Sequence, residues 1–279
     1  MSANTSIEWT DRTWNPVRGC QLVSPGCANC YAMKQAHRFS GPGKPYEGLT
    51  KIGGKGPVWT GKIKLVEEAL QEPLRWRKPA RIFVNSMSDL FHEDVPDTFI
   101  AMVWDVINRT QFRHTYQILT KRPQRMMEWV KKYASDFISP ALWLGVSVED
   151  KAHKVRIDAL RDTPTAVRFL SIEPLLEDLG EIDLTGIHWV IVGGESGPNA
   201  RSLHPDWVRS LRDQCQSAGV PFFFKQWGQY WPGEKGRLYR ESTIDWADGQ
   251  PMVRIGKKAA GRLLDGRTWD EFPVYSGDV

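Results

Sequence analysis

The stretch Trp189-Val-Ile-Val-Gly-Gly-Glu-Ser196 joins a short apolar run to a polar cluster, and this combination decides the predicted fold. A run of branched and aromatic residues of this length is typical of a buried β-strand. An amphipathic helical pattern follows over 206–217, with Pro205 as its start signal and Gly219 as its stop signal. A second apolar run begins at Phe222, so this segment is predicted to form a strand–helix–strand unit with parallel strands.

The same alternation extends through most of the chain. Helical patterns also lie between the other apolar runs, which predicts a parallel sheet covered by helices. The apolar runs are 81–85, 116–120, 142–146, 167–171, 189–192 and 222–225, and the segment around Glu8-Trp9-Thr10 is a candidate seventh strand. The helical patterns are 98–109, 124–133, 151–161 and 206–217.

Polar residues follow nearly every apolar run at its carboxyl end. In a (β/α) barrel all strands deliver these ends to one mouth, where the site lies. A doubly wound sheet instead gathers its ligands at a single switch point. We therefore favour an α/β fold with a partial or complete (β/α) TIM-like barrel, and a doubly wound sheet is the alternative. The polar clusters begin at Asn85, Thr120, Ser147, Ser171, Gly193 and Lys225.

The barrel domain is predicted to span residues 1–228, and residues 229–279 are predicted to be a C-terminal extension packed on it. The extension contains a hairpin turn signal, Asp248-Gly249, and a basic helical piece over 257–264. Residues 39–59 are dense in Gly, Pro and Lys, which predicts a long loop.

Composition sets broad limits on the class of protein. The chain has 279 residues and a net charge of +4, which permits an anionic partner such as nucleic acid without requiring one. No run approaches about 18 uncharged apolar residues, so no membrane helix is expected. Four cysteines are too few for a disulfide scaffold, so a cytoplasmic protein with thiol or metal chemistry is expected.

Three of the four cysteines lie within eleven residues, at Cys20, Cys27 and Cys30. Two residues separate the last two thiols, which is the spacing that lets both sulfurs reach one metal centre. With a fourth ligand such as His37 this segment would be a structural zinc site. With none it would hold a [4Fe–4S] cluster with one iron free to bind another molecule.

The cysteine segment resembles the signature of an uncharacterised three-cysteine family that is common in phage and prophage genomes. The resemblance rests on Trp14-Asn15-Pro16-Val17-Arg18-Gly19-Cys20 and on the Cys-x6-Cys-x2-Cys spacing, and it continues over nearly the whole chain. Further matching motifs are Asn85-Ser86-Met87-Ser88-Asp89, Thr120-Lys121-Arg122-Pro123, Gly145-Val146-Ser147-Val148-Glu149, Gly193-Gly194-Glu195-Ser196-Gly197 and Gly261-Arg262-Leu263-Leu264-Asp265-Gly266.

That family is regarded as similar to radical S-adenosylmethionine enzymes, which implies S-adenosyl-L-methionine as a second cofactor and an electron donor protein as a partner. Reductive cleavage of this cofactor would give a 5′-deoxyadenosyl radical that takes a hydrogen atom from substrate. By position, the expected cofactor-binding residues are Asn85, Ser86, Ser88, Asp89, Lys121, Ser147 and Glu149. The expected substrate contacts or proton donors are Glu173, Glu195 and Lys225.

The substrate is not identified by the sequence. Nucleic acid or a nucleotide is the leading candidate, because basic pairs such as Lys131-Lys132 accompany 13 Trp residues. The alternative function is a zinc-binding, non-catalytic protein that binds nucleic acid, with His37 as the fourth ligand.

Overall fold

The computed structural model of the chain describes residues 5–234, 237–238, 240, 244–247 and 249–274. The chain forms two compact units. Unit 1 comprises residues 1–146 and 159–168, and unit 2 comprises residues 147–158 and 169–279. Each unit is described by itself below.

Seven strands of one sheet are hydrogen-bonded in the order in which they occur along the chain. Strand order that follows chain order, with helices between parallel strands, is the topology of a (β/α) barrel, whereas a doubly wound sheet reverses direction. The first and last strands are not paired with each other among the described residues, so the predicted partial barrel is confirmed. The strands are β1 (Arg12–Trp14), β6 (Ala80–Val84), β7 (His114–Thr120), β8 (Leu142–Ser147), β9 (Val167–Ile172), β10 (Trp189–Gly193) and β11 (Phe222–Gln226).

In unit 1 the two long helices follow the apolar periodicity of the sequence. The helix α3 (Asp97–Thr110) begins after Pro96 and buries a face that includes Ile100, Val103 and Ile107. The helix α4 (Pro123–Tyr133) begins at a proline. Proline is tolerated there, because the N–H groups of a helix's first turn have no acceptor within the helix. Unit 1 also holds η1 (Pro25–Cys27), η2 (Glu67–Gln71), α2 (Glu72–Arg75) and the short β2–β5 pair (Val17–Arg18 and Lys64–Leu65).

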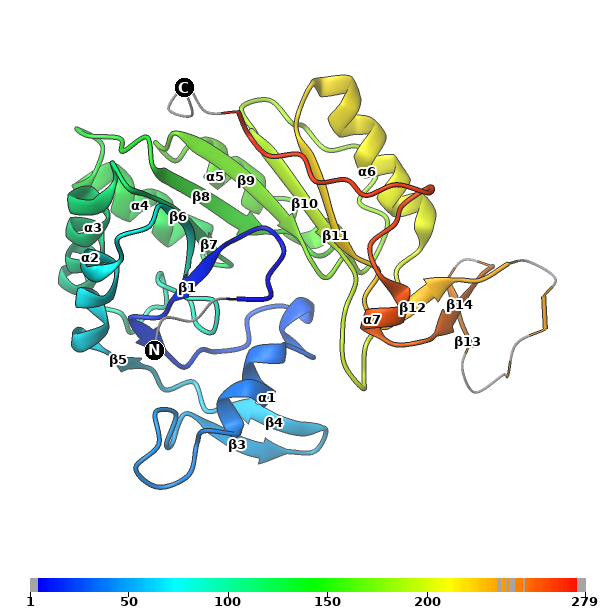
Figure 1. Cartoon of the computed structure of the whole chain (residues 1–279), viewed down its shortest axis with the longest axis horizontal. Coiled ribbons are helices and arrows are strands. Elements are labelled where there is room, and N and C mark those ends of the chain that lie inside the picture. The colour runs from blue at the N-terminus through cyan, green and yellow to red at the C-terminus, as the bar shows by residue number, and fades with distance from the viewer. Residues whose placement is uncertain (1–4, 235–236, 239, 241–243, 248, 275–279) are drawn as a thin grey trace. The chain divides into compact units, whose positions relative to one another are not determined.

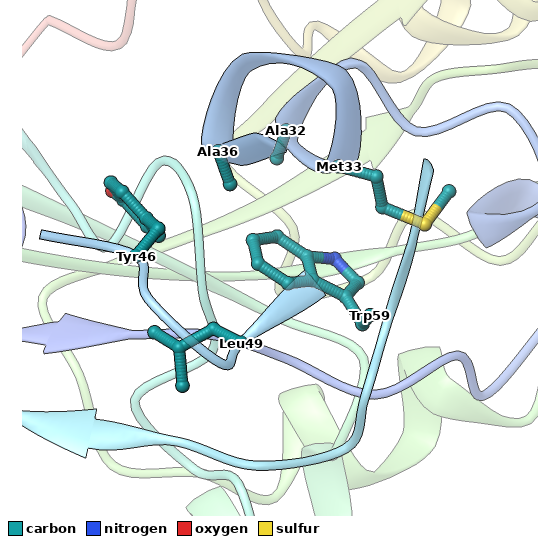
Figure 2. Close-up of a cluster of buried hydrophobic side chains, with 6 residues drawn as sticks. All are labelled: Ala32, Met33, Ala36, Tyr46, Leu49 and Trp59. Atoms are coloured by element: carbon teal, nitrogen blue, oxygen red, sulfur yellow. The ribbon is translucent and has the colours of Figure 1, made fainter. Parts of the chain in front are cut away.

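The segment predicted to be a long loop, residues 39–59, contains a β-hairpin in the structure. Its strands β3 (Thr50–Gly53) and β4 (Gly56–Trp59) pair antiparallel and pack against α1 (Tyr31–His37), as Figure 1 shows. Figure 2 shows the buried side chains that join helix and hairpin, with Trp59 between them. We call residues 31–64 the α1–hairpin lobe. Its buried cluster is Ala32, Met33, Ala36, Tyr46, Leu49 and Trp59.

In unit 2 the helix α6 (Pro205–Ala218) has the predicted start and stop. The His204 ring accepts the N–H of Asp206 at 3.1 Å, and Gly219 ends the helix with φ +66°. A left-handed residue at this position is the usual reason for glycine after a helix. The short η3 (Lys151–His153) stands where the helical pattern over 151–161 begins, and α5 (Arg156–Arg161) continues it.

Trp269, near the end of the described chain, packs on the strands of unit 2. Trp269 accepts the N–H of Phe224 through its carbonyl at 3.0 Å and stacks edge-on against Phe222. A small antiparallel sheet of β12 (Tyr230–Pro232), β14 (Gln250–Arg254) and β13 (Ile244–Ala247) precedes α7 (Lys257–Ala260). The predicted turn joins β13 to β14, although its Asp248 lies outside the described residues. The division at residues 228 and 229 stays a prediction.

Within the described ranges, every helix is too short or too polar to cross a bilayer.

Candidate functional site

The three clustered cysteines lie on consecutive short elements of unit 1. Cys20 follows β2, Cys27 ends η1, and Cys30 is the residue before α1. All three are half-buried. Gly19 fixes the path into this segment, because it has φ +88° and a Cβ there would lie 2.3 Å from the carbonyl oxygen of Lys62. Only glycine allows this close approach of two backbones.

Burial and neighbouring charges shift the pKa values of the Cys20 and Cys30 thiols. Burial raises the pKa of Cys20 to about 12, and the negative charges of Asp89 and Cys30 act in the same direction. Burial also raises the pKa of Cys30, with the neighbouring Cys27 adding to the shift and the ammonium of Lys121 opposing it. The thiols of Cys20 and Cys30 are therefore protonated at neutral pH, and a bound metal would have to displace their protons.

The side chains do not form a closed site for a single ion. Among the described residues, no three His, Cys, Asp or Glu side chains converge closely enough to hold a metal ion. The ring of His37, the predicted fourth zinc ligand, shares hydrogen bonds with Thr50 at 3.0 Å and Ser40 at 3.2 Å. A cubane cluster needs wider ligand spacing than one zinc ion, because each thiolate binds a different iron. Three cysteine thiolates are the kind of donor set that an iron–sulfur cluster takes.

The polar residues after β6 anchor the cysteine segment. The Asn85 side-chain oxygen accepts the N–H of Val17 at 3.2 Å, and the Ser88 hydroxyl donates to the Val17 carbonyl at 2.7 Å. The hydroxyl of Tyr31 donates to the Ser86 carbonyl at 2.6 Å. The Asn85 Nδ2 is buried and meets no acceptor within the described part of the chain. A buried donor without an acceptor is costly, so it marks a place where a ligand oxygen or sulfur would be stabilised.

Asp89 organises the loop after β7. Its Oδ1 accepts the Thr120 hydroxyl at 2.7 Å, and its Oδ2 accepts the Lys121 N–H at 3.2 Å and Arg122 Nη1 at 3.1 Å. The Arg122 Nε donates to Glu93 at 2.7 Å, which leaves the buried Nη2 without an acceptor among the described residues. The Lys121 ammonium takes part in no described ion pair. Two cationic groups beside the thiols thus have capacity for an anionic ligand.

In unit 2 four polar side chains meet at the carboxyl ends of β9, β10 and β11. Glu173 accepts Lys225 Nζ at 2.9 Å and Gln226 Nε2 at 3.0 Å, and Gln226 also contacts the Ser196 hydroxyl at 3.2 Å. A Cβ on Gly193 would lie 3.1 Å from the Glu173 carboxyl group. An ammonium paired with a carboxylate in a half-buried setting is an arrangement that can hold or pass a proton.

The Gly-Gly-Glu stretch, which begins at the last residue of β10, has a packing role in unit 2. A Cβ on Gly194 would lie 2.0 Å from the carbonyl oxygen of Trp227, so the chain passes too close for any side chain. Glu195 is 7% exposed and forms a two-point ion pair with Arg201, at 2.6 Å and 2.9 Å. Its carboxylate is therefore engaged inside the unit.

Ser147, at the end of β8, and Glu149, just after it, are both buried. Glu149 is fully buried, and its Oε2 accepts Arg156 Nη1 at 2.8 Å. The same Nη1 donates to the Ser147 carbonyl at 2.8 Å. Glu149 Oε1 has no partner among the described residues, so the site holds one open acceptor.

The predicted site residues are divided between the two units. Sequence reasoning missed Arg156 and Arg201, which pair with the buried carboxylates, and the only signal was an arginine following each glutamate within seven residues. The unit 1 group is Cys20, Cys27, Cys30, Asn85, Ser86, Ser88, Asp89 and Lys121, and the unit 2 group is Ser147, Glu149, Glu173, Glu195 and Lys225.

A large open hollow of about 1370 Å³ lies elsewhere in unit 2. Its lining includes His188 and Pro221, which precede β10 and β11, and residues from the end of α6. It therefore lies at the amino ends of these strands, away from the carboxyl ends that carry Glu173 and Lys225. None of the predicted site residues lines it.

The fold and the cysteine segment define an α/β protein built on a partial (β/α) barrel, with three clustered thiols after its first strands. The chain belongs to the family described as "Protein of unknown function (DUF5131)", which matches residues 4–273. No match was found among curated proteins or among solved structures.

Proposed function

We propose that this protein is a radical S-adenosylmethionine-type enzyme in which Cys20, Cys27 and Cys30 hold a [4Fe–4S] cluster. The observation that carries the proposal is the grouping of three thiols beside cationic side chains, in which Cys30 interacts electrostatically with both Cys20 and Cys27. Three protein thiolates leave the fourth iron of a cubane open to another ligand. When bound, the cluster supplies one electron for cleavage of S-adenosylmethionine to a 5′-deoxyadenosyl radical, which removes a hydrogen atom from substrate.

The side chains of unit 1 would bind and orient the cofactors. Lys121 and the unpaired Nη2 of Arg122 would offset the negative charge of the thiolates or hold a carboxylate. The Asn85 Nδ2 would donate to a ligand atom that replaces its missing acceptor. Asp89 holds Lys121 and Arg122 in place and is a positioning residue in this proposal.

The finer predictions from the sequence belong to the same proposal. They comprise the similarity to radical enzymes, the phage association, a reducing cytoplasmic location and an electron donor protein. Ser147 and Glu149 are proposed cofactor contacts of unit 2, and Glu173, Glu195 and Lys225 are its proposed substrate contacts. The Glu173–Lys225 pair is the best supported of these, because it joins an acid and a base at the strand ends.

The test is product formation by the anaerobically purified protein. Reduced protein supplied with S-adenosylmethionine should release 5′-deoxyadenosine, and the Cys20→Ser and Cys30→Ser variants should lose this activity. Cys215→Ala is the matched control, because Cys215 is buried in α6 and should leave activity unchanged. A colourless protein that contains stoichiometric zinc and releases no 5′-deoxyadenosine would contradict the proposal and favour the zinc-binding alternative.

A further inference from the structure

The α1–hairpin lobe, residues 31–64, carries an unusual share of the chain's positive charge. It holds seven Lys and Arg residues against one acidic residue, Glu47. The other 245 residues hold 30 basic and 32 acidic side chains, so they are slightly acidic. The net charge of +4 therefore arises from this lobe. The seven basic residues are Lys34, Arg38, Lys44, Lys51, Lys55, Lys62 and Lys64.

These cations are not neutralised within the protein. Six of the seven are exposed and Lys34 is half-buried. None of them takes part in an ion pair or a side-chain hydrogen bond within the described part of the chain. In unit 2, by contrast, Arg209 and Arg212 share the carboxylate of Asp265, at 2.8 Å and 2.5 Å. A set of unpaired cations on one small lobe attracts polyanions.

The lobe presents these charges on a fixed framework. One face of α1 is buried against Trp59 through Ala32, Met33 and Ala36, as Figure 2 shows. The opposite face carries Tyr31, Lys34 and Arg38, which are spaced one helical turn apart. Because the helix and hairpin share a packed core, the spacing of the cations is set by the fold.

Large apolar side chains accompany the cations on the surface. Tyr31, Phe39 and Ile52 are 54%, 47% and 67% exposed. Exposed aromatic rings between cations are suited to stacking on nucleobases. A bilayer is a poorer fit, because α1 has only seven residues and already buries its apolar face inside the lobe.

We propose that the α1–hairpin lobe is a docking surface for the phosphodiester backbone of a nucleic acid. The lysines would contact successive phosphates, and the exposed rings would contact bases or sugars. This inference goes beyond the proposed function and does not depend on it, because the surface is complete without a cluster. Binding is therefore expected of metal-free protein as well as of protein reconstituted with iron and sulfide.

The test measures binding of the full chain to short fluorescent oligonucleotides by anisotropy over a series of salt concentrations. Single- and double-stranded DNA and RNA probes identify which nucleic acid binds best. The variant Lys51→Gln/Lys55→Gln should bind roughly tenfold more weakly at low salt, and the slope of log affinity against log salt should fall by roughly 1.5, for two lost phosphate contacts. The matched control, Arg77→Gln/Lys78→Gln, removes the same charge from exposed positions just before β6 and should bind like the wild type.

Three outcomes would overturn the inference. The wild type could fail to bind every probe, both variants could lose equal affinity, or vesicles containing phosphatidylserine could compete better than any oligonucleotide. Thermal unfolding of each variant checks that the lobe stays folded. We expect unchanged melting temperatures, because Lys51 and Lys55 are exposed and their side chains make no described contact. A second variant, Phe39→Ala, should weaken binding to single strands and leave the salt slope unchanged.

Discussion

At the scale of single residues, Gly194 shows how closely the backbone is packed in unit 2. The Gly194→Ala variant should be less stable by about 2 kcal/mol, because the new Cβ would overlap a carbonyl that cannot rotate away. This corresponds to a melting temperature lower by roughly 4–8 °C. Gly54→Ala is the control, since nothing lies within 4 Å of a Cβ there. Equal melting temperatures for both variants would show that unit 2 relaxes around the added carbon.

The buried pair of Glu149 and Arg156 gives a second prediction at this scale. Arg156→Met should destabilise the protein by roughly 3 kcal/mol, because it leaves the Glu149 carboxylate buried without its cation. The exposed pair of Arg109 and Asp105 is the control, and Arg109→Met should cost less than about 0.5 kcal/mol. Urea unfolding measures both. If the two variants unfold alike, the ion pair with Arg156 does not stabilise the buried Glu149 carboxylate.

At the scale of elements, the sequence predicts the long helices well but neither the short helix α1 nor the hairpin that packs against it. The sequence predicted a helix over 206–217 and the structure has Pro205–Ala218, because proline, glycine and apolar periodicity all act locally. The β3–β4 hairpin was mistaken for a loop, since its sequence is rich in Gly, Pro and Lys. Its strands are stabilised by contact between Trp59 and α1, which no local pattern reveals.

A contact between α6 and the turn after residue 264 gives the pH-dependent prediction. Hydrogen bonds from Arg209 and then Arg212 hold the pKa of Asp265 below its ordinary value. A carboxyl group with a lowered pKa adds stability above its unfolded pKa and loses it as pH falls through the folded value. The wild type should therefore lose stability below about pH 4 more steeply than Asp265→Asn. The effect is small, because Asp265 is 38% exposed.

This pH dependence is measured by urea unfolding of both proteins between neutral and acidic pH. Glu234→Gln is a suitable control, because Glu234 is exposed at 75% and its Arg237 partner is exposed too. Parallel stability curves for the wild type and Asp265→Asn would show that α6 does not depend on this carboxylate.

At the scale of the whole molecule, the sequence identified the strand ends but not their partners. The barrel order and the positions of Glu173 and Lys225 followed from alternation of apolar and polar segments. Their pairing joins residues 52 positions apart, and Asp89 and Arg122 are 33 positions apart, so local patterns cannot predict either contact. The charge asymmetry of the α1–hairpin lobe was readable from the sequence, but its packed framework was not.

The proposed function requires the three thiols to hold a cluster with one iron open to S-adenosylmethionine. Electron paramagnetic resonance of the reduced, anaerobically prepared protein tests this most directly. We predict a cluster signal whose shape changes when S-adenosylmethionine is added and which is absent from the Cys27→Ser variant. A protein that binds no iron, or a signal that S-adenosylmethionine leaves unchanged, would contradict the claim.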